Sequence, residues 1–434
     1  MSLNIAIIGA GLTGLAAAYK LSGGGCRVTI FEEMSRPGGL VADFNAGQEK
    51  LERFYHHIFT GDRHLLDLCR ELGLEDGIEW FEPRNAIFLN NNLFPFTSPM
   101  DLLRFSPLKF ISRVRTGLLA LTSRFIHDYL PYDKVTARDW LIRRAGKDSY
   151  DKIWGPLLSS KFDRDADSIS GTWIWNKFKL RGSSRDKNLR SEQLGYMRGG
   201  FSTLISRLEA KILENGGVFR YNSKITGIDL HPDDKLSLSG DSRNEVFDKV
   251  LFTASPQILA SLPSPLPADF KDNLAALQMK ANICLTLELE QSLSPYYWIT
   301  VAQQDIPFVL AIEHTRLVGL RDYKSHIVYL SRYIDASNEL YRKSDNEVEE
   351  IFINGLLRVF PGFKRVQIRK ATVSRAQYAQ PVVLMGYSEM IPPVRTPING
   401  LYLASMSQIY PEDRGMNYAV RLGLQAVDEI LKNM

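Results

Sequence analysis

The sequence predicts an α/β domain joined to a second, α+β domain of mixed sheet and helices. Three observations carry this prediction. The chain has 434 residues, which exceeds the size at which a single hydrophobic core keeps growing. It begins with an apolar strand, a glycine-rich turn and a helical stretch. From about Trp80 the pattern changes to short apolar pieces that are interrupted by prolines and rich in aromatic residues, which indicates a second domain.

The first forty residues contain a strand, a turn and a helix in immediate succession. The apolar stretch 4–8 runs into Gly9, Gly11 and Gly14, and a helical stretch follows from residue 15. Gly9 permits a tight turn, Gly11 lets the backbone approach a pyrophosphate, and Gly14 allows the helix to pack closely on the strand. A phosphate bound there meets the positive end of the helix dipole. The pattern therefore predicts a Rossmann-like domain that binds a dinucleotide.

A second apolar strand, residues 27–31, ends on Glu32. An acid at this place binds ribose hydroxyls. Directly after it, Arg36, Gly38 and Gly39 resemble the second glycine pair that large flavoprotein families place over the same pyrophosphate. The combination is more similar to FAD-binding than to NAD-binding proteins, so we expect FAD as the cofactor. No second dinucleotide motif follows in the sequence, and we expect no dedicated NAD(P)H domain.

The composition indicates a globular enzyme. Hydrophobic residues make up 44% and charged residues 24% of the chain, and the net charge of +4 favours no particular partner, nucleic acid included. Cys26, Cys69 and Cys284 are too few and too scattered for a disulfide framework or a zinc site, so we expect no metal and a reducing compartment, the cytoplasm. We expect neither an export signal nor a membrane span, because no apolar run of about eighteen residues occurs.

The stretch between Leu102 and His127 contains five basic residues and no acid. The basic residues are Arg104, Lys109, Arg113, Arg115 and Arg124. Apolar residues at steps of three and four lie on one helical face, and they are Ile111, Val114, Leu118, Leu121 and Phe125. Two interpretations stay open. Either this face packs inside the domain, or the helix lies on an anionic membrane, which would place the protein peripherally at the inner face of that membrane.

A second basic stretch runs from Lys177 to Arg190, and Asp186 is its only acid. Its serine and glycine content predicts a loop. One interpretation is a loop that closes over a phosphorylated substrate, because several cations there can pair with phosphate oxygens. The other is a merely solvated loop.

The first domain is expected to return twice. Gly199 and Gly200 precede an amphipathic helix, strands follow at 218–221, 225–230 and 249–254, and a last strand at 399–404 precedes the final helix. We therefore predict a cofactor-binding domain of residues 1–79, 198–275 and 393–434. The substrate-binding domain is discontinuous, with residues 80–197 and 276–392. Within it we expect strands at 282–289, 307–312 and 326–330 and a helix at 348–360.

The glycine-rich start, the Gly199-Gly200 helix and the helix that Gly415 opens together resemble the FAD-dependent amine oxidase superfamily, especially its protoporphyrinogen oxidase and phytoene desaturase branch. That resemblance implies oxidation or desaturation of a bulky, largely apolar substrate, isoprenoid- or porphyrinogen-like, by hydride transfer to flavin N5. The segment Phe54 to Phe59 is also similar to the His-Ile-Phe segment of UDP-galactopyranose mutase, which implies a sugar-nucleotide mutase as the alternative. A flavin-binding protein without turnover is the third interpretation.

The resemblance also implies the residues of the site. His56 and His57 follow the second glycine pair and are the candidate catalytic residues, and packing within the segment is the alternative role for both. A residue near Ile225 is implied beside adenine, and the N-terminus of the last helix beside the flavin ring. The implied cofactor-binding residues are Gly9, Gly11, Leu12, Thr13, Gly14, Glu32, Glu33, Arg36, Gly38, Gly39, Leu40, Ile225, Ser405, Met406, Gly415, Met416 and Asn417.

Two positions depart from the family pattern. Ser405-Met406 stands where such families usually have Gly-Asp, so Ser405 or Ser407 has to replace the acid that binds FAD. Asn282 stands at the place of the lysine near flavin N5 in monoamine oxidases, with Lys280 two residues earlier. No cysteine lies near the C-terminal strand, and we therefore expect FAD to be bound non-covalently.

Overall fold

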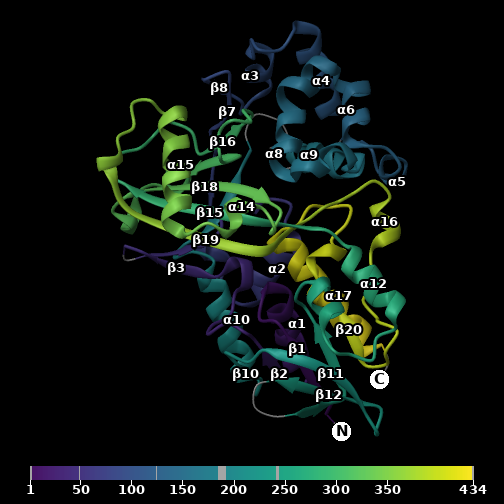
Figure 1. Ribbon diagram of the computed structural model, residues 1–434. Helices are drawn as coiled ribbons and strands as arrows, with labels where there is room; N and C mark the ends of the chain where they lie inside the picture. The colour runs from purple at the N-terminus through teal and green to yellow at the C-terminus, as the bar shows by residue number, and fades with distance from the viewer. Residues whose placement is uncertain (1, 48, 124, 184–191, 241–243, 433–434) are drawn as a thin grey trace.

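The computed structural model describes residues 2–47, 49–123, 125–183, 192–240 and 244–432. Figure 1 shows three parts: a lower part around β1, β2 and β20, a sheet with α15 above it at the left, and a group of helices at the upper right. Both ends of the chain lie in the lower part. The α17 helix and the ends of β15 and β19 lie where these parts meet, and the candidate site is built there.

The lower part contains a five-stranded parallel sheet with the order β10-β2-β1-β14-β20. These strands are β1 (Asn4–Ile8), β2 (Arg27–Phe31), β10 (Val218–Arg220), β14 (Lys249–Phe252) and β20 (Leu401–Leu403). One face packs against α1 (Leu12–Gly23), α10 (Ser202–Glu214) and α17 (Met416–Leu431). The other packs against the antiparallel strands β11 (Ile225–His231), β12 (Lys235–Gly240) and β13 (Glu245–Phe247). Because both faces are covered, β1 is apolar from Ile5 to Ile8, and the predicted Rossmann-like arrangement is confirmed.

The second sheet is mixed and has the order β19-β15-β18-β17-β16-β7-β8. Its strands are β7 (Asn85–Leu89), β8 (Asn92–Pro95), β15 (Met279–Leu289), β16 (Trp298–Val301), β17 (Leu310–Glu313), β18 (His326–Ile334) and β19 (Ile368–Pro381). Alternate residues of β18 point to opposite faces. Val328 and Leu330 pack against α15 (Asp345–Val359), whereas Tyr329 and Tyr333 belong to the core that faces α1 and α17. The sheet thus presents aromatic side chains toward the lower part.

The helical part follows β8 in the chain. Its helices are α3 (Pro99–Arg104), α4 (Phe110–Ser123), α5 (Leu130–Asp133), α6 (Ala137–Ala145), α7 (Lys147–Ser149), α8 (Gly155–Phe162) and α9 (Gly171–Ser183). Its core is rich in tryptophan, with Trp140, Trp154, Trp173 and Trp175 all buried. Lys177 and Lys179 lie on α9, so the beginning of the predicted cationic loop is helical. The rest of that stretch, from residue 184 to Arg190, lies outside the described residues.

Short elements connect these parts. The strands are β3 (Asp43–Ala46), β4 (Glu49–Glu52), β5 (Ile58–Phe59), β6 (Ile78–Phe81) and β9 (Leu194–Met197), and the helices are α2 (Arg63–Glu71), α11 (Pro256–Ser261), α12 (Ala268–Ala276), α13 (Thr315–Val318), α14 (Glu339–Arg342) and α16 (Tyr387–Met390). The sheet β5-β9-β6 joins segments on both sides of the predicted domain boundaries, and the boundary at 79/80 falls inside β6. Where one domain ends and the next begins therefore stays a prediction.

Within the described ranges, every helix is either too short or too polar to cross a bilayer.

Candidate functional site

Three glycines shape the turn between β1 and α1. Gly9 has a φ of +105°, and a Cβ there would lie 2.7 Å from Oγ1 of Thr253, a residue that the sequence analysis missed. A Cβ on Gly14 would lie only 2.1 Å from the carbonyl oxygen of Gly9, so the helix touches the turn at this point. A Cβ on Gly11 would meet no atom within 4 Å. The backbone of Gly11 therefore faces open space at the start of α1.

The second glycine pair packs against this turn. The N–H of Gly38 donates to the carbonyl oxygen of Ala10 with an N···O distance of 2.9 Å. Gly38 and Gly39 have φ angles of +125° and +57°, which only glycine adopts readily. A Cβ on Gly39 would lie 3.2 Å from Cα of Gly11. The two glycine motifs thus form one surface, and any side chain at Gly39 would crowd the approach to Gly11.

Glu32 lies beside the turn at the end of β2. Its carboxylate accepts hydrogen bonds from the backbone N–H groups of Ala10 (2.8 Å) and Met34 (2.9 Å), one on each oxygen. The carbonyl oxygen of Glu32 accepts from the N–H of Ser223 at 2.9 Å. That bond brings Ile225, a buried residue at the start of β11, into the neighbourhood of Glu32. Because each carboxylate oxygen keeps a free lone pair, the residue can still accept from ribose hydroxyls.

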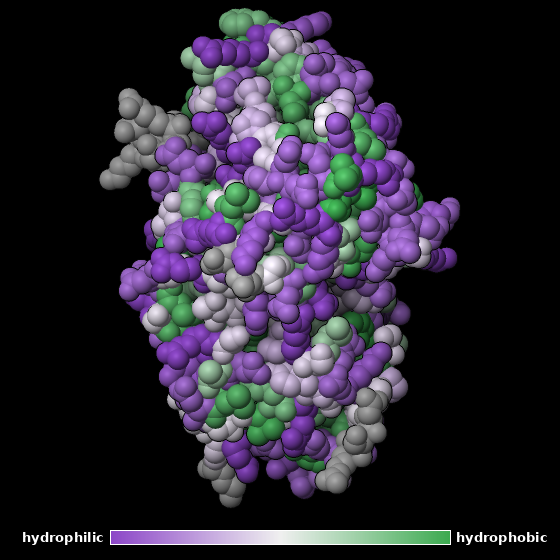
Figure 2. Space-filling model, turned by 90° about the vertical axis from the view of Figure 1, so that its left-hand side faces the viewer, coloured by the Kyte–Doolittle hydropathy of each residue, from purple (hydrophilic) through white to green (hydrophobic). Residues whose placement is uncertain are grey.

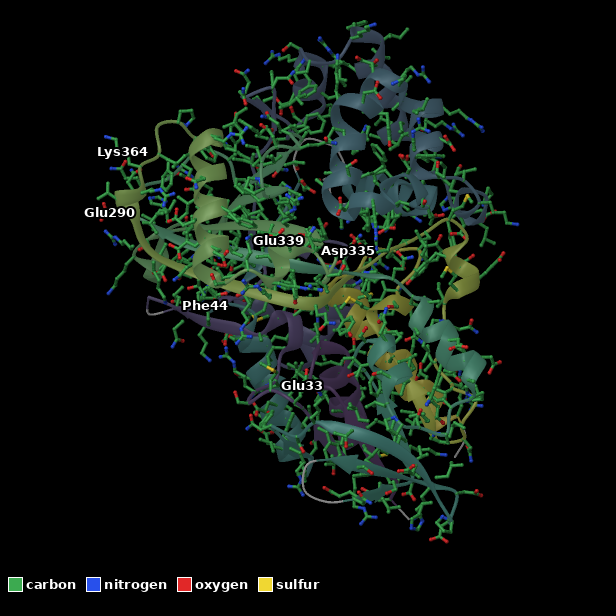
Figure 3. All side chains as sticks on the ribbon, viewed as in Figure 1. Glu33, Phe44, Glu290, Asp335, Glu339 and Lys364 are labelled. Carbon is green, nitrogen blue, oxygen red and sulfur yellow. The ribbon has the colours of Figure 1, made fainter. Side chains whose placement is uncertain are left out.

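The other predicted residues of this region differ in exposure. Leu12 is buried in α1, and Thr13 and Leu40 are partly buried. Glu33, labelled in the lower part in Figure 3, is exposed. Arg36 is exposed too, and its guanidinium bonds Oδ1 of Asp43 at 2.7 Å and the Asp43 carbonyl oxygen. Arg36 is thus held next to the glycine pair by an acid of β3.

The last helix is fixed against the first. A Cβ on Gly423 of α17 would lie 2.5 Å from the carbonyl oxygen of Thr13, so only glycine allows this close packing. Gly415 caps α17 with an extended φ of −178° and is exposed. Met416 is buried, and the side-chain oxygen of Asn417 accepts from the backbone N–H of Leu65 at 3.1 Å. The N-terminus of α17 therefore opens to solvent while the rest of the helix is locked to α1.

Gln408 stabilises the backbone at Ser405-Met406. The N–H of Ser405, which follows β20, donates to Oε1 of Gln408 at 2.7 Å. Nε2 of Gln408 donates to the carbonyl oxygens of Pro392 (3.1 Å) and Leu403 (3.0 Å). This amide holds the short 3-10 turn Met406–Gln408 in place without the usual acid.

His56 and His57 lie in the segment between β4 and β5. Nδ1 of His56 donates to the carbonyl oxygen of Phe54 at 2.7 Å, and burial lowers the pKa of His56 to about 4, so the imidazole is neutral at pH 7. Nδ1 of His57 lies 3.3 Å from the hydroxyl of Tyr297, and its ring stands edge-on to Phe59 at 4.8 Å. His56 is therefore engaged with its own backbone, whereas His57 belongs to an aromatic cluster.

A chain of polar contacts joins this segment to the N-terminus of α17. Arg414 is the residue before Gly415. Its Nη2 donates to the hydroxyl of Tyr333, and its Nε donates to Oε1 of Gln380 at 3.0 Å. The hydroxyl of Tyr333 lies 3.1 Å from that of Tyr55, which precedes His56. The sequence analysis missed Arg414 and Tyr333. The position of Arg414 directly before the glycine that opens the last helix was the available signal.

Lys280 is engaged elsewhere. Its ammonium group is fully buried and forms ion pairs with Asp165 (2.7 Å) and Asp335 (2.6 Å), and Arg164 approaches Asp335 at 3.3 Å. Asp335 lies at the junction of the three parts (Figure 3). Nδ2 of Asn282 donates to Oγ of Ser331 at 2.9 Å. Lys280 thus ties the helical part to the mixed sheet, and the structure gives it a binding partner on each side.

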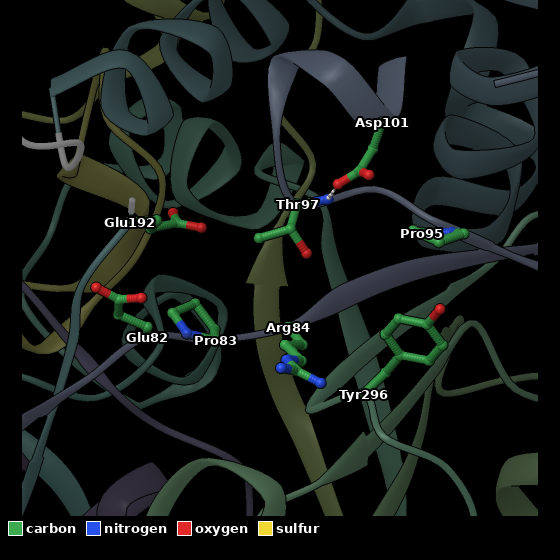
Figure 4. A pocket seen from close by; sticks show the side chains of 8 residues that line it. All are labelled: Glu82, Pro83, Arg84, Pro95, Thr97, Asp101, Glu192 and Tyr296. Carbon is green, nitrogen blue, oxygen red and sulfur yellow. Dashed lines mark hydrogen bonds between the residues drawn. The ribbon is translucent and has the colours of Figure 1, made fainter. Parts of the chain in front are cut away.

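A cavity of about 350 Å³ opens beside β7 and α3 (Figure 4). Its lining consists of Glu82, Pro83, Arg84, Pro95, Thr97, Asp101, Glu192 and Tyr296. None of the predicted cofactor-binding residues lines it. Tyr296 precedes Tyr297, which contacts His57, so the cavity lies next to the aromatic cluster rather than inside the glycine-lined region.

The family model described as flavin containing amine oxidoreductase matches residues 12–431. The chain belongs to this family. The description of this family names a flavin and oxidoreduction. The resemblance to this superfamily and the expected fold class are confirmed.

Individual relatives are distant. Coproporphyrinogen III oxidase of Staphylococcus aureus is 26% identical over 290 residues, which cover 59% of this chain and 62% of that protein. A probable zeta-carotene desaturase of Synechococcus elongatus is 25% identical over 41% of this chain and 42% of its own length. The chain thus spans about half the length of such curated relatives.

Solved structures agree over the whole chain. A putative protoporphyrinogen oxidase from Exiguobacterium sp. 255-15 has a TM-score of 0.79 at 20% identity and covers 100% of both chains. A reduced UDP-galactopyranose mutase has a TM-score of 0.77 at 16% identity and covers 100% of this chain and 95% of its own. At these identities the likeness concerns the fold alone.

The residues present fit a flavin dinucleotide. The open space at Gly11, the glycine surface of Gly38 and Gly39 and the exposed cap Gly415 leave room for a ligand along the α1 and α17 N-termini. Both helix ends present unpaired N–H groups, which attract negative charge. The individual cofactor contacts predicted above stay predictions.

Proposed function

We propose that the protein binds FAD non-covalently and oxidises or desaturates a bulky, largely apolar substrate. The main support for this proposal is a chain of hydrogen bonds from Arg414 through Tyr333 to Tyr55, which links the cap of α17 with the aromatic segment around His57. When bound, the flavin supplies the acceptor for the hydride that leaves the substrate. The protein then has to align a C–H bond and keep water away.

Aromatic side chains are suited to that task. The Tyr55 ring stands edge-on to Trp298 at 5.2 Å and to Tyr329 at 6.3 Å, and His57 stands edge-on to Trp298 at 5.9 Å. These rings form one packed aromatic cluster whose tyrosine hydroxyls bond within the protein, which favours isoprenoid- or porphyrinogen-like substrates. The hydroxyl of Tyr297 and the imidazole of His57 are the polar groups that can orient a substrate or hold a proton.

Anaerobic mixing tests the oxidation. Flavin-loaded protein is mixed with a porphyrinogen, a carotenoid precursor and a sugar nucleotide, and the flavin absorbance is followed. We expect bleaching by one of the first two, in a stoichiometry of one flavin per substrate, and recovery after an electron acceptor is added. Bleaching by none of the apolar candidates, together with rearrangement of the sugar nucleotide by pre-reduced protein, would contradict the proposal.

A flavin-dependent sugar-nucleotide mutase is the second candidate. It is favoured by the cations Lys161, Lys177 and Arg414, which gather near the same helix cap and suit a pyrophosphate. A mutase must be reduced first and then cycles without net loss of electrons. The same mixing experiment therefore separates the two.

FAD rather than a shorter flavin is supported by Glu32 and Ile225, because they lie beside the turn where a ribose and an adenine would extend from the pyrophosphate. Cys69 and Cys284 are buried in the packed core, which favours a non-covalent cofactor. Heat-denatured protein should release FAD into the supernatant. The three free thiols also suit a reducing compartment, for which we propose the cytoplasm.

The α4 helix supports contact with an anionic membrane. Its inner face is small and mostly polar: Ser112 and Thr116 are buried, and Oγ1 of Thr116 lies 2.9 Å from Oγ of Ser149. Its outer face carries the large apolar side chains, with Ile111 68%, Leu118 55% and Leu121 48% exposed. The interpretation in which the apolar face packs inside is therefore wrong. Figure 2 shows apolar surface near the top of the molecule, at the end that holds α3 and α4.

Basic residues flank this surface. Arg104 and Lys109 are exposed beside Phe110, which is 70% exposed, while Arg124 lies outside the described residues. A stripe of apolar side chains with cations at its edge suits the boundary between lipid headgroups and acyl chains. We therefore propose a peripheral membrane contact here, with an anionic bilayer as the partner.

A further inference from the structure

Two lysines share one carboxylate at the cap of α17, and an arginine follows that carboxylate in the chain. Nζ of Lys161, on α8, lies 3.2 Å from Oδ2 of Asp413, and Nζ of Lys177, on α9, bonds the same oxygen. Oδ1 of Asp413 accepts from Nε2 of Gln380 at 3.0 Å. Arg414 follows Asp413 directly and bonds Gln380 as well. The group therefore carries two more positive than negative charges when both lysines are protonated.

Neighbouring charged groups do not supply the missing negative charge. Beside the group, Lys280 and Arg164 pair with Asp165 and Asp335, so that set is neutral. The carboxylate of Glu412, the residue before Asp413, accepts hydrogen bonds from the two terminal guanidinium nitrogens of Arg421 at 3.0 and 2.8 Å. The excess charge is local to Lys161, Lys177 and Arg414.

This excess lies mostly out of water. The side chains of Lys161 and Asp413 are 16% and 9% exposed, and that of Lys177 is 34% exposed. Both ammonium groups stand over the ring of Trp173, at 4.8 and 5.1 Å from its centroid. Holding more cations than carboxylates in such a place costs free energy, and burial lowers the pKa of Lys161 to about 7. A cluster of this kind is a candidate functional site.

The group also lies beside the predicted reaction centre. Arg414 precedes the exposed cap Gly415, and its contact Tyr333 touches Tyr55. Lys177, being partly exposed, keeps the group open to solvent from the helical part. An anion that enters here would meet three cations and the positive end of α17, next to the aromatic cluster.

We propose that Lys161, Lys177 and Arg414 bind an anionic group, a phosphate or a carboxylate, of the apolar substrate. This inference rests on the proposed function, because it assigns the polar end of that substrate, and it makes the substrate amphiphilic. The anion displaces Asp413 from the lysines or binds beside it, and its negative charge neutralises the excess.

Binding of probes to flavin-loaded protein tests this inference. Farnesyl diphosphate, farnesoate and farnesol share one apolar chain and differ in their end group, and inorganic pyrophosphate lacks the chain. Calorimetry should show an anionic farnesyl probe bound at least about tenfold more tightly than farnesol, since charge-assisted hydrogen bonds replace a neutral contact. The tighter of the two anions assigns phosphate or carboxylate as the recognised chemistry.

Substitutions of opposite sign complete the test. Lys177→Met should weaken binding of the anionic probe about ten- to hundredfold, and Asp413→Asn should strengthen it, because the competing carboxylate is gone. Lys179→Met, on the same helix but over Trp175, is the matched control and should change nothing. Flavin content and thermal midpoint confirm that each variant is folded. If the cluster has only a structural role, Lys177→Met and Asp413→Asn should both weaken binding of the anionic probe or both leave it unchanged.

Equal affinity for farnesol and the anions, or unchanged affinity in both Lys177→Met and Asp413→Asn, would overturn the inference. The readout is binding, so it is independent of turnover. Tight anion binding without any flavin bleaching would instead contradict the proposed oxidation and leave the anion site standing.

Discussion

The carboxylate of Glu52 accepts a hydrogen bond from the backbone N–H of Phe201, 149 residues further along the chain, at 2.5 Å. Its other oxygen accepts from the hydroxyl of Tyr196 at 2.8 Å. A Cβ on Gly200 would lie 3.0 Å from the same carboxylate, and Gly200 has a φ of +79°. The glycine pair before α10 thus allows a buried acid of β4 to anchor the start of that helix.

This burial predicts a pH-dependent stability. Desolvation raises the pKa of Glu52 from 4.5 to about 7, so the folded protein holds this proton more tightly than the unfolded chain does. The corresponding stabilisation, about 3 kcal/mol, is fully present below pH 4.5 and is lost as the pH rises through about 7. In urea unfolding, Glu52→Gln should therefore gain stability relative to the parent protein between pH 5 and pH 8.

Glu350→Gln is the control for this prediction. Glu350 is exposed and bonded to Arg365, which holds its pKa below the usual value, so it stays charged over that pH range. Parallel pH curves for the parent protein and Glu52→Gln would show that Glu52 is not protonated in the folded state.

Gly11→Ala should abolish tight flavin binding and leave the fold intact. The new methyl group meets no protein atom within 4 Å, so it fills the space predicted for the pyrophosphate. The expected result is apoprotein with an unchanged thermal midpoint and at least about tenfold weaker FAD affinity, which corresponds to about 1.4 kcal/mol. Gly362→Ala, also in open space but far along the chain, should bind FAD normally. Full FAD occupancy in both variants would place the cofactor elsewhere.

His57→Ala should lower kcat about a hundredfold while FAD stays bound, if its imidazole holds or moves a proton together with Tyr297. Steady-state kinetics with an apolar substrate measures the effect. The exposed His64 of α2 is the control, and His64→Ala should be fully active. An unchanged kcat in His57→Ala would show that His57 only packs against its neighbours and takes no part in catalysis.

Liposome flotation tests the α4 surface. Replacing Ile111 and Leu118 by serine should remove most of the binding to anionic vesicles without lowering the thermal midpoint, because both side chains are exposed. Arg104→Glu/Lys109→Glu should have the same effect, at about 1 kcal/mol per cation. We choose these two because Arg113 and Arg115 bond backbone carbonyls of the protein.

The control for flotation is Val366→Ser, which removes an exposed apolar side chain from another surface. Binding should also fall with salt, as expected for screened charges. Flotation that is equal for all variants, or absent for the parent protein, would remove the membrane contact.

Lys280→Met should destabilise the protein by about 3 kcal/mol, because it leaves Asp165 and Asp335 without their buried cation. Asp335→Asn in the same chain should recover part of the loss. Urea unfolding measures both. Lys343 is only partly exposed, but it pairs with exposed carboxylates alone, so Lys343→Met should change the midpoint little. A stable Lys280→Met variant that no longer reduces its flavin would show a catalytic rather than a structural lysine.

Much of the lower part could be predicted from the sequence, since its signals are local. The spacing of Gly9, Gly11 and Gly14 encodes a turn whose backbone geometry other residues cannot adopt, and the run 4–8 is apolar because both faces of a parallel sheet are buried. The strands at 282–289 and 326–330 and the helix at 348–360 were likewise predicted, and the structure has them as β15, β18 and α15.

The substrate side of the site could not be predicted in this way. The cluster is built from four separate segments of the chain, and nothing in their local sequence shows that they meet: they contribute Lys161, Lys177, Tyr333 and Asp413. The orientation of α4 was equally out of reach. Helical periodicity shows that Ile111 and Leu118 share a face, but which face turns inward depends on whether Ser149 and the neighbouring helices supply partners for Ser112 and Thr116.

The sequence by itself determined the cofactor class and the fold class, because a phosphate-binding turn needs glycine at fixed spacing and its chemistry is contained in a few consecutive residues. Tertiary structure alone decided where charge accumulates and which apolar face stays exposed. Both depend on contacts between segments far apart in the chain. Lys161 pairs with Asp413, 252 residues away, and Glu52 accepts a hydrogen bond from the backbone of Phe201. Coulombic and desolvation energies act through space, and no local pattern records them.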